Sequence, residues 1–105
     1  MTWIVLWEYR VAAEATSAFE RLYGPNGDWA ALFRTAAGFL GTELLHDDTE
    51  PARYLTVDRW VSHSAYEQFR QAHAARYRHL DEEGDRLTER ERRLGAFTLL
   101  GGAER

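Results

Sequence analysis

The segment from Arg53 to Tyr66 constrains the fold most, because its residue pattern changes there from a strand to a helix. Its first part alternates with a period of two, which is typical of a β-strand that has large side chains on both faces. One face carries Tyr54, Thr56, Asp58 and Trp60. The strand is expected to end at Ser62 or Ser64. Because Glu67 follows Ser64 by three residues, we predict a capping box that opens a helix at Ser64.

Periodicity also predicts the other elements of the chain. A two-residue period predicts strands, and apolar residues at i, i+3, i+4 and i+7 predict helices. The expected strands are 3–11, 39–46 and 94–100, and the expected helices are 13–23, 28–36 and a last one from Ser64 to Leu80. The mixed charges of residues 81–93 predict a solvated, helical or frayed connector.

These elements follow one another in the order β-α-β-β-α-β, if the two N-terminal helical runs form one broken helix. This order predicts an α+β, ferredoxin-like fold, in which an antiparallel four-stranded sheet carries its helices on one face. The 105 residues suffice for a single domain, residues 1–105. Strand 3–11 and the strand that begins at Arg53 are bulky on both faces, so we expect the bare face of the sheet to pack against a second copy in a homodimer.

The composition argues against several classes of partner. The net charge is −4, and no basic stripe suited to nucleic acid is present. The apolar N-terminus has no basic lead and reaches Glu8 after a few residues, so neither a signal peptide nor a membrane span is expected. The absence of cysteine fits a reducing compartment. We therefore expect a cytoplasmic protein that binds neither nucleic acid nor membranes.

Neither a cofactor nor a metal ion is expected from the motifs. Gly38 and Gly41 follow a helix instead of linking a strand to one, which does not fit a dinucleotide-binding loop. The spacings of His63, His73 and His79 do not place two imidazoles on one face of a helix.

Three residues are candidates for catalysis, each with a structural alternative. His73 lies on the aromatic side of the expected last helix, where a neutral imidazole could carry a proton near pH 7. The favoured alternative is that His73 packs against the sheet with its nitrogen hydrogen-bonded. Trp60 and Tyr66 flank the strand-to-helix corner, where such rings form either a pocket wall or the core.

The element order and two sequence runs resemble the antibiotic biosynthesis monooxygenase family of dimeric α/β-barrel proteins. The runs are Gly38-x-x-Gly41-Thr-Glu-Leu-Leu45 and Arg53-Tyr-Leu-Thr-Val-Asp-Arg-Trp-x-Ser62. The resemblance implies a homodimer and, in active members, cofactor-independent oxygenation of electron-rich aromatics such as hydroquinones, anthrones or polyketides. Trp60 and Tyr66 match two functional positions of the polyketide-oxidising subset, and Thr56 stands where that subset has Asn.

The combined hypothesis is a cofactor-independent monooxygenase that acts on a phenolic, quinol or polyketide-like aromatic. In this interpretation Trp60 and Tyr66 orient the substrate and His73 takes its proton. The alternative is a non-catalytic dimer that binds an aromatic small molecule or serves as a stress-related accessory protein. A non-oxidative cyclase or isomerase on the same fold is a third hypothesis.

Overall fold

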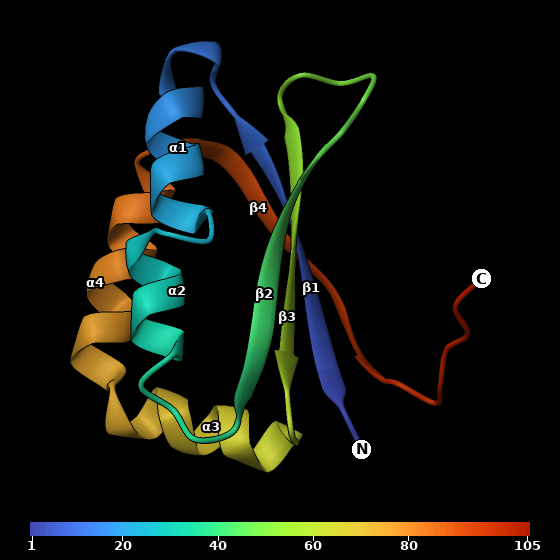
Figure 1. The fold of residues 1–105 in the computed structure, drawn as a ribbon. Helices are drawn as coiled ribbons and strands as arrows, with labels where there is room; N and C mark the ends of the chain where they lie inside the picture. Colours follow the sequence, from blue (N-terminus) through green and yellow to red (C-terminus); the bar gives the residue numbers. More distant parts are fainter.

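A computed structural model describes all of residues 1–105 and shows a sheet covered on one face by helices (Figure 1). The strands are β1 (Trp3–Val11), β2 (Phe39–His46), β3 (Arg53–Trp60) and β4 (Thr88–Thr98). The helices are α1 (Thr16–Tyr23), α2 (Asp28–Phe33), α3 (His63–Ala72) and α4 (Ala74–Asp85), with a 3-10 turn at Ala13–Ala15. The strands pair antiparallel in the order β2-β3-β1-β4, which confirms the expected ferredoxin-like α+β fold.

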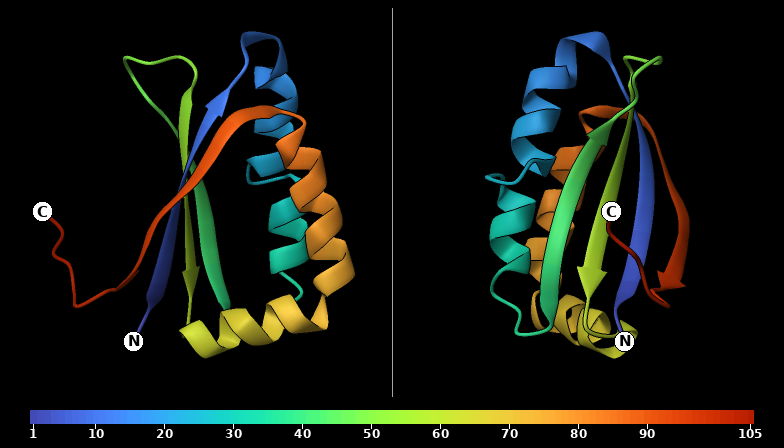
Figure 2. Two further views of the ribbon diagram at one scale, coloured as in Figure 1. Left: turned by 180° about the vertical axis from the view of Figure 1, so that it is seen from behind. Right: turned by 45° about the vertical axis from the view of Figure 1, so that its right-hand side comes forward.

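The helices form the second layer. Helices α1, α2 and α4 lie along the inner face of the sheet, and α3 crosses the end of the sheet where β3 stops (Figure 2). None of the protein's own helices covers the outer face. The C-terminal tail after β4 leads away from the helical layer.

The two-residue period of β3 accounts for its position in the sheet. All four residues on its inner face are buried, and those between them on the outer face are only half-buried. Strand β3 pairs with β1 on one side and with β2 on the other, so its inner side chains face the middle of the helical layer. The core forms there from aromatic rings and large aliphatic side chains, among them Phe19, Tyr54, Trp60, Phe69 and Leu80.

The predicted cap of the helix after β3 was wrong. Ser62, instead of Ser64, is the N-cap: its Oγ accepts a hydrogen bond from the amide of Ala65 at 3.0 Å. Strand β3 ends at Trp60, so the extended backbone at Ser62 comes immediately before the helix, as an N-cap requires. Ser64 therefore lies inside the first turn.

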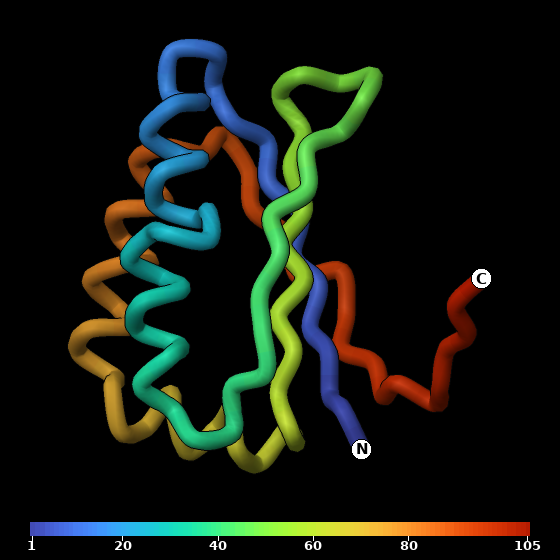
Figure 3. Tube along the Cα trace, viewed as in Figure 1, coloured from blue at the N-terminus to red at the C-terminus, as the bar shows by residue number.

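The single helix expected from Ser64 to Leu80 is two helices, α3 and α4. The break lies at His73, whose φ of −121° and ψ of 32° are outside the helical region. The chain changes direction at this point, so that α4 runs back along the sheet (Figure 3). Periodicity did not reveal the break, because the apolar spacing continues through it.

The prediction of a helical or frayed connector over residues 81–93 was wrong beyond Asp85. Helix α4 continues to Asp85, and β4 begins at Thr88 instead of at Leu94. The charged part of β4 pairs with β1, so backbone hydrogen bonds to a neighbouring strand determine its conformation. A bulge opposite Leu6 and Trp7 adjoins Gly95, whose φ of 155° favours glycine.

Candidate functional site

A small cavity lies between the inner face of the sheet and the helices α1, α2 and α4. Its volume is about 30 Å³, which is room for one or two water molecules. Its aromatic lining consists of Trp7, Tyr9, Tyr23, Trp29, Phe33 and Tyr77. Its polar lining consists of Thr42, Thr56, Asp58, Asp81 and Glu91. Carboxyl groups in an aromatic surrounding are a suitable setting for proton transfer.

Asp58 is a buried carboxyl group in the lining of this cavity. Its side chain lies on the inner face of β3 and is only 8% exposed. Its Oδ1 accepts a hydrogen bond of 2.6 Å from the hydroxyl of Thr42 on the neighbouring strand β2. Burial raises its pKa from 3.8 to about 6, and the hydrogen bond from Thr42 only partly offsets this rise. Asp58 forms no ion pair, and a carboxyl with this pKa can exchange a proton near neutral pH.

A second polar contact lies on the same face of the sheet, beside Asp58. The hydroxyls of Tyr9 and Thr56 are 3.2 Å apart, and both side chains are buried. Burial raises the pKa of Tyr9 well above 10, so its phenol stays neutral. The Thr56 hydroxyl thus contacts the Tyr9 hydroxyl of β1, and Thr56 lines the cavity together with Asp58.

Two further acids line the cavity from the side of α4 and β4. Burial raises the pKa of Glu91 from 4.5 to about 7, and the negative charges of Asp81 and Asp85 add to this effect. Burial also raises the pKa of Asp81. Tyr23 reaches towards the same end, because its hydroxyl lies against Gly84 of α4: a Cβ at that glycine would be only 2.1 Å from the oxygen. Only glycine at position 84 leaves this room.

Trp60 and Tyr66 lie beside the cavity without lining it. Trp60 is fully buried, and its ring packs against Phe33 of α2 and Phe69 of α3 at centroid distances of 5.6 and 5.1 Å. The hydroxyl of Tyr66 is 3.0 Å from that of Tyr77, whose ring does line the cavity. Both predicted residues therefore support side chains that form the wall.

His73 is not among the residues that line the cavity. It lies at the break between α3 and α4, where its Nε2 is 3.5 Å from the hydroxyl of Thr35. Its ring packs on Phe69 at a centroid distance of 5.3 Å. The structure thus brings Trp60 and Tyr66 together at 5.4 Å between ring centroids but leaves His73 at the edge of the helical layer.

Sequence reasoning did not select Asp58 as a site residue. A signal for it was present, because Asp58 shares the period-two face of β3 with Tyr54 and Trp60, and a charge on a core-facing position must be paired or face a pocket. Asp81 and Glu91 gave no such signal, since they belong to a long run of mixed charges.

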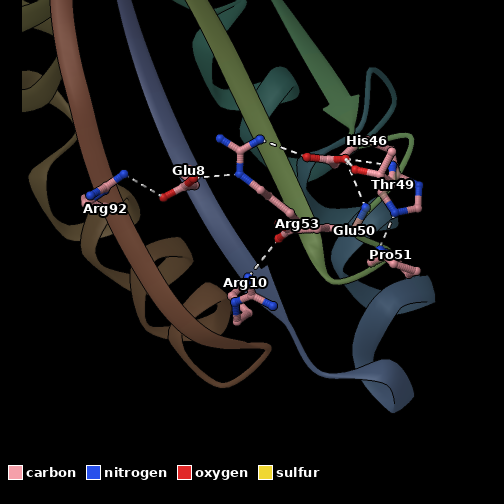
Figure 4. Close-up of polar contacts among 9 residues, drawn as sticks. Glu8, Arg10, His46, Thr49, Glu50, Pro51, Arg53 and Arg92 are labelled. Atoms are coloured by element: carbon pink, nitrogen blue, oxygen red, sulfur yellow. Dashed lines mark hydrogen bonds and ion pairs between the residues drawn. The ribbon is translucent and has the colours of Figure 1, made fainter.

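The outer face of the sheet carries a separate charged network (Figure 4). Glu8 on β1 accepts a hydrogen bond from Arg53 Nε on β3 at 2.7 Å and is paired with Arg92 on β4 at 3.1 Å. Hydrogen bonding from Arg53 lowers the pKa of Glu8. Arg53 also binds Asp47 of the β2–β3 loop at 2.9 Å. These pairs join three strands and the loop, which indicates a structural role.

No group of three or more histidine, aspartate or glutamate side chains is arranged to bind a metal ion. None of the helices is long and apolar enough to cross a membrane.

Comparison with known proteins identifies the family. The family model described as antibiotic biosynthesis monooxygenase matches residues 2–80. The chain belongs to this family. A search among proteins of curated function gave no significant match.

Solved structures of other proteins share the fold of this chain. SnoaB, a cofactor-independent oxygenase from Streptomyces nogalater, is 20% identical with a TM-score of 0.72, and the match covers 96% of this chain and 95% of SnoaB. Rv0793 from Mycobacterium tuberculosis is 17% identical with a TM-score of 0.73, and the match covers 99% of this chain and 100% of Rv0793. At these identities the likeness establishes the fold.

Proposed function

We propose that this protein is a cofactor-independent monooxygenase acting on a phenolic, quinol or polyketide-like aromatic, with Asp58 as the base that takes the substrate's proton. The observation that carries the proposal is a buried carboxyl without an ion pair, in a cavity lined by six aromatic rings. Family membership supports the reaction class, and SnoaB is a cofactor-independent oxygenase of the same fold.

The reaction needs no external reductant. Asp58 accepts the proton of an aromatic hydroxyl, and the resulting phenolate is electron-rich enough to reduce dioxygen. A carbon–oxygen bond then forms at a ring carbon that carries hydrogen, which gives a hydroperoxide. Loss of water from this hydroperoxide leaves a quinone, so one phenol and one O₂ give one quinone and one H₂O. A general base of pKa near the working pH suits the first step.

The residues predicted from sequence take supporting roles in this proposal. Trp60 holds Phe33 and Phe69 in place, and Tyr66 fixes the Tyr77 ring through their hydroxyl contact. Both side chains would thereby orient the substrate through the wall of the cavity. His73 stays a predicted proton carrier, and it competes with Asp58 for that role in the experiment below.

Substrate entry requires movement of the helical layer. A volume of about 30 Å³ is far below the roughly 300–1,000 Å³ of typical ligand pockets. Helix α2 has only six residues, and it follows a turn at which α1 ends. We infer that side chains of α2 and α4 move apart to admit an aromatic ring.

We also propose that the protein forms a homodimer through the outer face of its sheet. Apolar side chains gather on this face between the charged residues: Ile4, Leu6, Leu45, Leu55, Val57 and Phe97. Leu45 and Phe97 are 46% and 51% exposed, which is costly in water for a continuous apolar patch. Sedimentation velocity is expected to give twice the chain mass, and a monomer at all concentrations would contradict this assembly.

Oxygen consumption by the purified protein tests the proposed activity. A panel of anthrone, hydroquinones and naphthols is supplied under air, and uptake is compared between wild type, Asp58→Asn and His73→Gln. We expect uptake by the wild type, a loss of about 10²-fold or more in Asp58→Asn, and a small change in His73→Gln. The reverse order would assign the proton transfer to His73.

Binding without oxygen uptake would favour the alternative function. If the wild type binds members of the panel but consumes no oxygen with any of them, the protein is a binding module for aromatic molecules and the proposed reaction is wrong.

A further inference from the structure

The indole nitrogen of Trp29 is a buried hydrogen-bond donor without an acceptor. Trp29 lies on α2, is 6% exposed and lines the cavity. Its Nε1 has no hydrogen-bond partner. A buried donor without a hydrogen-bond partner lowers the stability of the folded protein by on the order of 1–3 kcal/mol, so such donors are rare in native proteins.

The surroundings of Trp29 explain why the protein itself offers no acceptor. Its ring packs edge-on against Tyr77 at 5.0 Å and near Tyr23 at 6.2 Å, so aromatic rings flank the indole. The Tyr23 hydroxyl lies near the indole N–H, which acts against the rise that burial causes in the pKa of Tyr23, but the two groups do not reach hydrogen-bond geometry. Trp29 on α2, Asp81 on α4 and Glu91 on β4 define one end of the cavity, whereas Asp58 lies on β3.

The charge at this end determines which ligand atom fits. Asp81 and Glu91 line the same cavity and form no ion pair with an arginine or histidine. Their negative charge disfavours a carboxylate or phosphate. A donor N–H in turn disfavours an ammonium group at the same point. An uncharged acceptor oxygen, such as an aryl ketone or quinone carbonyl, meets both conditions.

We propose that Trp29 Nε1 is a specificity-determining donor that binds a carbonyl oxygen of the substrate, at the end of the cavity formed by α2, α4 and β4. Together with Asp58, it selects aromatics that carry a hydroxyl for the base and a separate carbonyl for the indole. This inference rests on the proposed function, because it uses the same cavity.

A pair of ligands of equal shape tests the proposal. 4-Hydroxyacetophenone and 4-isopropylphenol differ by a carbonyl oxygen in place of a methyl group, and calorimetry at neutral pH measures both mainly as neutral phenols. The variant Trp29→Phe removes the N–H and keeps an aromatic ring. Trp3→Phe is the matched control, since Trp3 does not line the cavity and its ring stacks on the imidazole of His63.

We expect Trp29→Phe to weaken 4-hydroxyacetophenone by roughly 3- to 10-fold, the range of one neutral hydrogen bond. Its effect on 4-isopropylphenol should stay within about twofold, and Trp3→Phe should leave both affinities unchanged. In the wild type, the Trp29 indole proton should shift downfield in NMR spectra with 4-hydroxyacetophenone only. This second measurement does not depend on the folding of a variant.

Three results would overturn the proposal in different ways. Equal losses for both ligands, with no indole shift, would show that Trp29 acts by packing alone and would leave the proposed function intact. Tighter binding of tyramine, unaffected by Trp29→Phe, would show that the two acids select a cation instead. Failure of the wild type to bind any of the three phenols would contradict both the carbonyl subsite and the proposed function.

Discussion

Replacing Asp58 by asparagine should make the protein more stable while it removes activity. The variant Asp58→Asn is nearly isosteric, and its amide oxygen can still accept the hydrogen bond from Thr42. What it removes is the cost of ionising a buried carboxyl. A rise in pKa from 3.8 to about 6 corresponds to about 3 kcal/mol.

The sign of the effect follows from proton binding. Between pH 3.8 and about 6, Asp58 is protonated in the folded protein and ionised in the unfolded chain. The wild-type free energy of unfolding therefore falls as the pH rises through this window. The free energy of unfolding of the asparagine variant lacks this fall. The difference between the free energies of unfolding of the variant and the wild type should be near zero at pH 4 and should reach about 3 kcal/mol by pH 8.

Urea unfolding followed by tryptophan fluorescence measures this difference at a fixed protein concentration from pH 4 to pH 8. Asp48→Asn is the control, because Asp48 is an exposed aspartate of the β2–β3 loop, and its change should stay within about 0.5 kcal/mol of zero. A difference between wild type and Asp58→Asn that is flat with pH, or that favours the wild type at pH 8, would refute the account of Asp58 as a buried, unpaired base.

Three other substitutions probe the surroundings of the site. Gly84→Ala should lower stability by about 1–3 kcal/mol in urea unfolding, because the new methyl group overlaps the Tyr23 hydroxyl; an unchanged midpoint would contradict that contact. Thr42→Val should move the pH midpoint of the Asp58 stability difference upwards, since the carboxylate loses its donor, and a downward shift would show that another group sets this pKa. Glu8→Gln should cost about 1 kcal/mol at low salt and less at high salt, as half-exposed ion pairs do; a salt-independent loss would point to packing instead.

Much of the fold followed from the periodicity of the chain. The strands β1 and β2 were predicted with their observed bounds, because their side chains alternate with a period of two. The start of β3 was also predicted, but β3 ends at Trp60, before the predicted Ser62 or Ser64. Strand β4 was predicted six residues short at its start. Its first half carries charge on nearly every residue, and only its pairing with β1 makes it a strand. The sequence contains no local signal for such pairing.

The candidate site was harder to predict than the fold. Trp60 and Tyr66 were predicted as site residues because they are large rings at a strand-to-helix corner, and their rings do contact one another. The cavity lies beside them and is lined by other side chains. The break of the last helix at His73 redirects α4, which brings Tyr77 and Asp81 over the sheet. An uninterrupted helix places these residues differently, so the site depends on a kink that periodicity conceals.

In the proposed reaction, Asp58 initiates a monooxygenation that uses only the substrate and dioxygen. Turnover of anthrone or a naphthol under ¹⁸O₂, with the product analysed by mass spectrometry, measures whether oxygen from O₂ enters the product and whether Asp58 is needed. We predict one ¹⁸O atom in each quinone formed by the wild type, and a rate at least about 10²-fold lower for Asp58→Asn. Equal rates for the two proteins, or a product without ¹⁸O, would contradict it.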